Sequence, residues 1–255
     1  MNPVLETLLK HQSIRKYKNQ PLEQEKLDLI IRAAQAAPNW CNGQHVSIIA
    51  VRDPERKKIF AKLCNNQEFI STCAVFLVFC SDFYRTSLAF EMHDNKILTE
   101  KFVSQVDTLL VGSHDVGITM ENAIVAAESM GLGTVPIGSI RLHSLEVCKE
   151  LNLPKYVIPI CGLCIGYPDD NPGVKPRLPS KAVYFDEEYD TTSLKEKIAE
   201  YDAEYQAYLA SRGSNERSST WSKTISSFYP NIYGKYDEDY ELFKKQGYIS
   251  IDKKH

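Results

Sequence analysis

The 255-residue sequence lacks long apolar runs, a strong excess of either charge, internal repeats and low-complexity tracts. No stretch approaches the roughly 18 uninterrupted apolar residues of a membrane span. The 30 Lys and Arg residues are balanced by 33 Asp and Glu residues, for a net charge of −3, which argues against nucleic acid as the main partner because phosphate binding needs a basic face. We therefore expect neither a membrane nor nucleic acid as a partner. Hydrophobic residues make up 43%, enough for a packed core, and the length suggests one large domain, with or without an appendage.

Several ligand-binding motifs are also missing. There is no GxGxxG dinucleotide fingerprint and no GxxxxGK[ST] phosphate loop. Neither HExxH nor an EF-hand loop occurs, and the six histidines show no zinc spacing, so we expect no metal site. The glycine-rich GLGTVPIG, Gly131–Gly138, fits neither nucleotide motif, and we interpret it as a helix end, a strand and a turn.

Seven cysteines, an odd number, are scattered along the chain. The N-terminal MNPVLETLLKHQ carries an acidic residue and no long apolar run, so we expect no signal peptide, and free thiols in a reducing cytoplasm. CGLC, Cys161–Cys164, matches the CxxC redox pattern but lies within the apolar run PICGLCIG. A redox CxxC sits at an exposed helix N-terminus, whereas side chains in a strand alternate between faces. We therefore favour buried strand cysteines over a redox pair.

Apolar periodicity and capping residues predict helices and strands over most of the chain. Asp53 followed by Pro54 is typical of an N-cap with proline at the first helical position, and Gly131 is typical of a helix end. Predicted strands cover Val46–Val51, Ala74–Cys80, Thr134–Ile140 and Pro159–Pro168. Predicted helices cover Pro3–Lys10, Pro21 to before Pro38, Pro54 to about Leu63, a long helix best defined over Val116–Met130, Leu145–Leu151 and Leu194–Ala210.

The composition changes after the last predicted strand. A proline-rich loop, DDNPGVKPRLP, leads to a polar helix that carries a tyrosine stripe at Tyr201, Tyr205 and Tyr208. Residues 191–255 are polar and aromatic, and they cannot bury enough apolar area alone. We therefore expect a core of residues 1–190, and an appendage of residues 191–255 that packs on the core or on another subunit and is not an independent domain.

The stretch HQSIRKY near the N-terminus places His11, Ser13 and Arg15 at alternate positions. In an extended segment these side chains could converge on one ligand, and the combination suits a phosphate or an anionic ring edge. A second basic pair, Lys175 and Arg177 in KPR, would lie on one side of an extended segment. Two such clusters suit a phosphorylated, planar and partly apolar cofactor, with a solvated charged turn as the plain alternative.

Segments spread over nearly the whole chain share the order and spacing of one protein family. They are HQSIRKY, AAQAAP, NNQEFI, AVFLVFCSDFYR, ENAIVAAESMGLGTVPIGSIR, LPKYVIPICGLCIGYPDDNPGVKPRLP and YLASRGSNERSSTWS. Together they are highly specific, although none decides alone. The chain resembles the nitroreductase family, in the branch of NADPH-dependent flavin reductases and oxygen-insensitive nitroreductases.

The resemblance implies a fold and an assembly. The family fold is α+β, with a mixed central β-sheet flanked by helices. A long helix forms the core of an FMN-containing homodimer, and a C-terminal excursion wraps the partner subunit. Two FMN sites lie at the dimer interface, so residues 1–190 would form the FMN-binding core, and residues 191–255 would serve in dimer wrapping and in NADPH binding.

The resemblance also implies contacts to the FMN phosphate. His11, Ser13 and Arg15 would contact the phosphate and ribityl oxygens. Lys175 and Arg177 would contact the phosphate or the N1–O2 edge of the flavin. One of these two cations would stabilise negative charge on the flavin, and no residue is expected to act as a general acid or nucleophile.

Further residues would surround the flavin ring. Gln67 would hydrogen-bond the rim of the isoalloxazine. Ile137, Gly138 and Ser139 would line the ring, with one of their backbone N–H groups facing the flavin N5.

One segment departs from the family pattern. APNWCNGQ stands where this branch usually has a short serine-rich run, so its residues Asn39, Trp40 and Cys41 are expected to contact FMN in place of that run. Their different size and polarity alter the expected substrate pocket.

Arg212 and Arg217, in SRGSNERSS, are candidates for binding the 2′-phosphate of NADPH.

The resemblance implies an FMN-dependent NADPH oxidoreductase that reduces nitroaromatics, quinones or free flavins by ping-pong hydride transfer. The chemistry would belong to the flavin. Two alternatives stay open at this point. One is a non-catalytic flavin-binding or thiol redox-sensing protein. The other is a flavin-consuming or dehalogenating enzyme on the same scaffold.

Overall fold

The computed structural model describes residues 2–211, 218–232 and 234–249. The chain divides into two compact units, which we describe separately. The first contains the described residues up to Asp170 together with those from Tyr236 onward, and the second is Asn171–Lys235. The chain thus leaves the first unit twenty residues before the predicted boundary at 190 and returns to it near the C-terminus.

A four-stranded sheet forms the centre of the first unit, in the order β1-β2-β4-β3. All three strand pairs are antiparallel, and among the described residues the parallel pairing of the expected mixed sheet is the single bridge between Ser13 and Thr134. The strands are β1 (Val46–Val51), β2 (Val75–Asp82), β3 (Gly133–Ile137) and β4 (Val157–Gly166).

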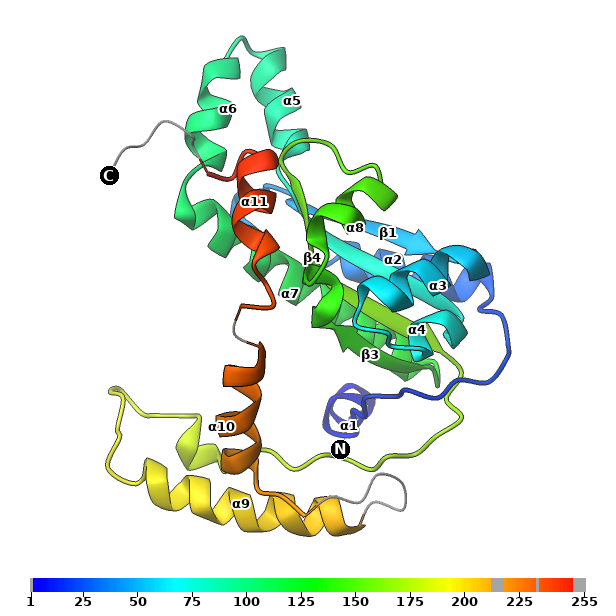
Figure 1. The fold of residues 1–255 in the computed structure, drawn as a ribbon, viewed down its shortest axis with the longest axis vertical. Coiled ribbons are helices and arrows are strands. Elements are labelled where there is room, and N and C mark those ends of the chain that lie inside the picture. The colour runs from blue at the N-terminus through cyan, green and yellow to red at the C-terminus, as the bar shows by residue number, and fades with distance from the viewer. Residues whose placement is uncertain (1, 212–217, 233, 250–255) are drawn as a thin grey trace. The chain divides into compact units, whose positions relative to one another are not determined.

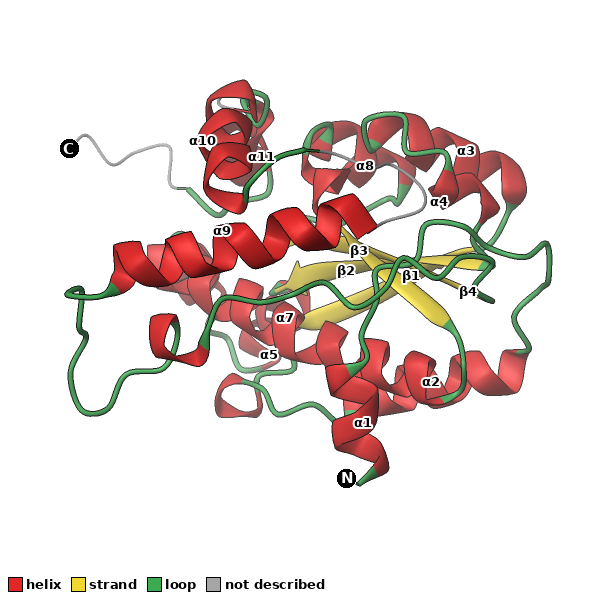
Figure 2. Cartoon of the chain, turned by 90° about the horizontal axis from the view of Figure 1, so that it is seen from below, coloured by secondary structure: helices red, strands yellow, loops and turns green. Residues whose placement is uncertain are grey.

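Helices cover both faces of this sheet (Figure 2). The central strand β2 is buried along its whole length, because its apolar residues serve both faces in alternation. Phe76, Val78 and Cys80 belong to one hydrophobic cluster, whereas Leu77 and Phe79 belong to the other. One face carries α3 (Pro54–Leu63), α4 (Phe69–Thr72) and α8 (Ser144–Glu150), and the other carries α2 (Gln24–Gln35) and α7 (Val106–Ser129).

The remaining elements of the first unit are short (Figure 1). They are α1 (Pro3–Leu9), η1 (Trp40–Asn42), α5 (Tyr84–Met92), α6 (Lys96–Val103), η2 (Gly138–Arg141) and α11 (Glu238–Lys245).

Among the described helices, none is both long and apolar enough to cross a membrane.

Several predicted element ends are confirmed. The Asp53 side chain accepts a hydrogen bond from the backbone N–H of Arg56 at 2.8 Å, as an N-cap should, and Pro54 opens α3. Gly131 has a φ of +76°, the left-handed conformation that ends α7. The predicted strand Val46–Val51 is β1, residue for residue.

Three predicted boundaries are wrong by more than two residues. The second helix begins at Gln24 and not at Pro21, because Glu23 stays extended and its carboxylate accepts a hydrogen bond from Tyr167 Oη at 2.6 Å. The third strand ends at Ile137, where the chain turns into η2. The long helix begins ten residues before Val116, because its first turns bury small and polar side chains that do not produce an apolar period.

The second unit contains η3 (Ser180–Ala182), α9 (Leu194–Ser211) and α10 (Trp221–Ile232). In α9 only Tyr201 and Leu209 are buried, and none of the described residues of α10 is. Trp221 packs its ring against Tyr201, with centroids 5.8 Å apart, and the Asp202 carboxylate accepts hydrogen bonds from the backbone N–H and hydroxyl of Ser222. Side-chain burial in this unit is therefore sparse.

Candidate functional site

The basic segment near the N-terminus runs along β3. The N–H of Ile14 donates to the carbonyl of Thr134 at 2.9 Å, and the Ile14 side chain packs against the bare Cα of Gly133, where an added Cβ would meet it at 2.6 Å. Ile14 is buried in the core. Its neighbours Ser13 and Arg15 therefore face away from the core, Ser13 half-buried and Arg15 exposed.

His11, the third predicted residue of this segment, is oriented by a residue that the sequence did not single out. Its Nδ1 lies 2.8 Å from Oε1 of Glu128 in the last turns of α7. The same oxygen accepts a 2.6 Å hydrogen bond from the hydroxyl of Thr134, which is buried. Glu128 therefore joins the basic segment to the sheet, and no local pattern in the sequence could reveal it.

Gln67 and Ser139 meet directly, although 72 residues, from α4 to β3, separate them in the sequence. Gln67 Nε2 donates to Ser139 Oγ at 2.9 Å, and Ser139 Oγ donates to the carbonyl of Cys64 at 3.1 Å. Asn65 and Asn66 adopt left-handed φ values of 64° and 56°, which turn the chain after α3 and place Gln67 there. The Asn-Asn pair is the sequence signal of this turn.

Gly138 lies between Ile137 and Ser139, where β3 gives way to η2. Its φ is not left-handed, and an added Cβ would meet no atom within 4 Å. Neither backbone geometry nor crowding within the described residues therefore requires glycine. The bare Cα leaves a surface beside the Gln67–Ser139 pair that a flat ring can approach closely, so these residues fit a flavin.

The predicted residues Asn39, Trp40 and Cys41 lie elsewhere in the first unit. They lead into β1, whose first residue pairs with Ser81 near the C-terminal end of β2. Ser13 lies beside Thr134, which the register aligns with Val75 at the other end of β2. The rise from Val75 to Ser81 is about 20 Å. Within one chain, the structure does not bring these three residues next to the basic segment.

The predicted cations Lys175 and Arg177 belong to the second unit, where both are exposed. Tyr201 Oη donates to the carbonyl of Pro176, between them, at 2.8 Å. Tyr208, two turns further along α9, donates to the carbonyl of Pro172 at 3.3 Å. The tyrosine stripe therefore holds the proline-rich loop by its carbonyls.

Burial raises the pKa of Tyr201, and the nearby charge of Arg177 partly offsets this increase. Arg212 and Arg217, the two residues predicted to read the NADPH phosphate, lie outside the described residues.

The CGLC motif lies within β4, as the sequence predicts, and all seven cysteines are free. Cys164 is buried and Cys161 partly buried. Burial raises the pKa of both thiols, which is the opposite of what a reactive redox pair requires.

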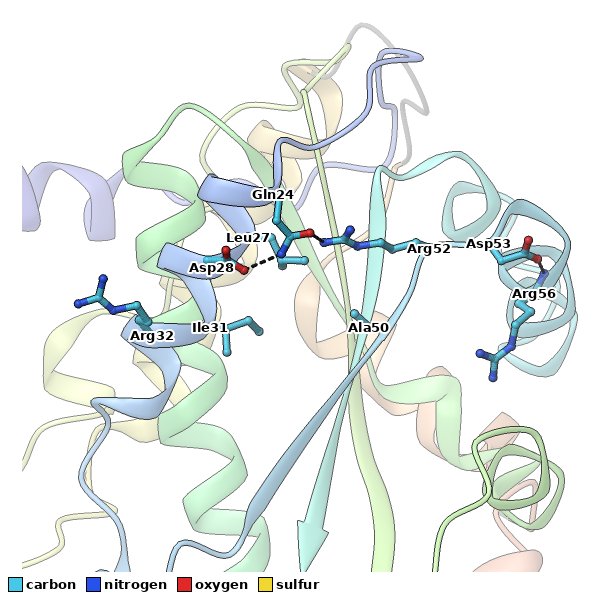
Figure 3. A pocket seen from close by; sticks show the side chains of 9 residues that line it. All are labelled: Gln24, Leu27, Asp28, Ile31, Arg32, Ala50, Arg52, Asp53 and Arg56. Atoms are coloured by element: carbon cyan, nitrogen blue, oxygen red, sulfur yellow. Dashed lines mark hydrogen bonds between the residues drawn. The ribbon is translucent and has the colours of Figure 1, made fainter.

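A shallow pocket of about 880 Å³ lies over the outer edge of β1, between α2 and α3, and contains none of the predicted site residues (Figure 3). Arg52 reaches across it to Gln24, at 2.7 Å, whereas Arg56 is turned to the carbonyl of Glu150. Arg32 points away from both (Figure 3). The three guanidinium groups do not converge, so the pocket does not form an anion site.

Comparison with known proteins decides the family. The model of the Nitroreductase family matches residues 8–167, and the model of its C-terminal domain matches residues 175–250. The chain belongs to the nitroreductase family. This nitroreductase-family chain carries the main part of the family and then its C-terminal domain. Its sheet covered by helices on both faces is the expected α+β fold.

Individual members of the nitroreductase family are similar to this chain over almost its full length. The FMN reductase (NAD(P)H) of Bacillus subtilis strain 168 is 43% identical, over 97% of this chain and 98% of its own. The NADPH-flavin oxidoreductase of Vibrio harveyi is 40% identical, over 89% of this chain and 90% of its own. The solved structure of NfrA2 from B. megaterium superposes with a TM-score of 0.92 at 43% identity, covering 98% of this chain and 99% of that one.

Proposed function

We propose that this chain is an FMN-dependent NADPH oxidoreductase that reduces small electron acceptors such as nitroaromatics, quinones or free flavins. The observation that carries the proposal is the Gln67–Ser139 hydrogen bond beside Gly138, in a family whose relatives include flavin reductases. The pair offers an amide to the rim of a flavin, and the glycine lets the ring approach the backbone.

The basic segment would bind the phosphate end of FMN. Ser13 and Arg15 face outward beside β3, and Glu128 orients His11. A hydroxyl, a guanidinium and an imidazole together supply the donors that a phosphate prefers. Ile137 and Ser139 would line the ring, with Gln67 at its rim.

When bound, FMN would supply the redox chemistry, which is hydride transfer from NADPH to a small electron acceptor. The protein's own part is to bind, orient and polarise. Lys175 or Arg177 would place positive charge at the N1–O2 edge, where it favours electron density on the ring. Tyr201 supports this role by fixing the carbonyl between the two cations. No side chain is assigned as a proton donor.

A homodimer would complete each site. Asn39, Trp40 and Cys41 are separated from the basic segment of their own chain by the length of β2, so they would serve the FMN of the partner. One face of α7 supports this arrangement, because Val106 and Leu110 are 74% and 64% exposed. Gly117 lies on that face, and an added Cβ would meet nothing within 4 Å. An exposed glycine inside a helix is unfavourable alone but allows a second helix to approach.

Of the appendage predicted at residues 191–255, the part before Tyr236 would wrap the partner subunit, because the described residues from Tyr236 onward belong to the first unit of their own chain. Arg212 and Arg217 would bind the 2′-phosphate of NADPH. With all seven cysteines free, the protein suits a reducing compartment, and we place it in the cytoplasm.

The test is the colour and turnover of the purified protein. It should be yellow, with about one FMN per chain, and should oxidise NADPH steadily when a quinone is supplied. A colourless protein that takes up no FMN on titration would refute the proposal. A yellow protein without turnover would favour a flavin-binding sensor. Destruction of the flavin or release of halide would favour the other enzymes of this scaffold.

A further inference from the structure

The turn before β1 is strained. Cys41, Asn42 and Gln44 have left-handed φ values of 48°, 55° and 56°. Asparagine tolerates this conformation, but cysteine and glutamine seldom adopt it. Such strain persists only where the surroundings impose it, and it occurs preferentially at functional sites. The question is therefore which group imposes this shape.

One buried carboxylate holds both ends of the turn. Asp115, on α7, has no exposed surface. Its Oδ1 accepts a 3.0 Å hydrogen bond from the backbone N–H of Trp40, and its Oδ2 lies 3.1 Å from Nδ1 of His45. His45 is itself buried and stacks on Phe83, with ring centroids 4.4 Å apart. A third nitrogen, Nδ1 of His114, lies 3.4 Å from Oδ1.

Further contacts prevent the turn from relaxing. The guanidinium of Arg85 donates to the carbonyl of Gln44 at 2.6 Å, and Asn39 Oδ1 accepts from the N–H of Gln44 at 3.1 Å. Gly43 is required for close approach, because an added Cβ would meet the His45 ring at 1.9 Å. The turn is thus fixed at Trp40, at His45 and at Gln44 between them.

This rigid turn presents an exposed aromatic ring. The indole of Trp40 is 44% exposed, although its backbone is anchored to a fully buried group. A planar ring held on an immobile backbone is a stacking surface, and stacking selects flat aromatic partners over compact ones.

We propose that Asp115 is a positioning residue, which holds the Trp40–Gln44 turn so that the Trp40 indole stacks on planar aromatic electron acceptors. This inference rests on the proposed function, which places the turn at the flavin of the partner subunit. Asp115 acts only through the turn, whereas Trp40 touches the acceptor. The turn thereby favours quinones and nitroaromatics over acceptors that lack a flat ring.

The experiment compares a flat acceptor, menadione, with a compact one, ferricyanide, on the FMN-loaded enzyme with NADPH. The quantity is the ratio of kcat/KM for menadione to that for ferricyanide. We expect Trp40→Ala and Asp115→Asn each to lower this ratio about three- to tenfold. Trp40→Phe should retain most of it. Asp107→Asn, an exposed position on the same helix, should leave it unchanged.

The double variant Asp115→Asn/Trp40→Ala separates positioning from general stability. If Asp115 acts through Trp40, the double variant should lower the ratio no further than Trp40→Ala alone. The proposal would be overturned if the double variant lowered the ratio by the product of the two single effects, or if Trp40→Ala left the ratio unchanged. If Asp115→Asn does not fold, the two Trp40 variants still decide whether the Trp40 indole selects flat acceptors, and an unchanged ratio in Trp40→Ala overturns the proposal. Failure of the wild type to bind FMN or oxidise NADPH would instead refute the proposed function, before any variant is made.

Discussion

Gln67 Nε2 donates a 2.9 Å hydrogen bond to the hydroxyl of Ser139, 72 residues further along the chain. That hydroxyl donates in turn to the carbonyl of Cys64, at the C-terminal end of α3. The two bonds tie the turn after α3 to the turn after β3. The amide of Gln67 is therefore held in place before any ligand arrives, and its orientation depends on one hydroxyl.

Ser139→Ala should weaken FMN binding about fivefold, the effect of losing about 1 kcal/mol of hydrogen bonding. The loss arises because Gln67 is no longer oriented. The double variant Gln67→Ala/Ser139→Ala should therefore weaken FMN binding little more than either single variant does. Fluorescence titration of the FMN-stripped protein with FMN measures this. Independent, multiplied losses would show that Ser139 does not act through Gln67.

Glu128→Gln should weaken FMN binding about tenfold or more, since a hydrogen bond to a charged group contributes about 1.5–3 kcal/mol. The carboxylate holds the His11 imidazole beside the site, where the ring can donate a hydrogen bond to a phosphate. Binding of riboflavin, which has no phosphate, should change much less. The exposed Glu25→Gln on α2 is the matched control. Equal losses for riboflavin and FMN would contradict the role given to His11.

Gly117→Phe should convert the proposed dimer into a monomer and lower its FMN content, because the ring would occupy the space that a second helix needs. The change should not damage the protomer, since a central glycine disfavours a helix by about 1 kcal/mol relative to alanine. Light scattering after gel filtration gives the molar mass, and circular dichroism checks the fold. Lys58→Phe, on the exposed side of α3, should stay dimeric. A dimeric Gly117→Phe protein would place the interface elsewhere.

Arg212→Ala and Arg217→Ala should each raise the Michaelis constant for NADPH and leave that for NADH almost unchanged. The two nucleotides differ only by the 2′-phosphate, which needs a cation. Each loss should amount to about 1–3 kcal/mol and shrink with added salt. Steady-state kinetics with both nucleotides and one quinone measure it. Parallel losses with NADH would remove both arginines from phosphate recognition.

Thiol reactivity should single out Cys41, the one cysteine that is exposed. Burial raises the pKa of Cys64 to about 12, so this thiol stays protonated and unreactive at pH 8. In the FMN-stripped protein, a thiol reagent should therefore modify Cys41 first, and the rapid phase should vanish in Cys41→Ser. Unfolding should expose all seven thiols. Rapid modification of Cys161 and Cys164 would revive the redox-pair interpretation of CGLC.

Local chemistry is what the sequence could determine by itself. The strands were predictable because continuous apolar runs such as Ala74–Cys80 can only be buried on both faces of a sheet. The start of α3 was predictable because Asp53 caps it through its own side chain, and the end of α7 because Gly131 accepts a left-handed backbone. These features depend on neighbours within a few residues.

The tertiary structure decided what depends on distant partners. The first turns of α7 were missed because their buried residues are Thr108, Gly112 and Asp115, which have no apolar period. Gly112 is small because Ser81 lies against it, where an added Cβ would come within 2.0 Å of the hydroxyl. Hydrogen-bonded pairs far apart in the chain, such as Glu128 with His11, likewise leave no local pattern. Their geometry exists only after the sheet and α7 have packed together, because packing alone brings those atoms within bonding distance.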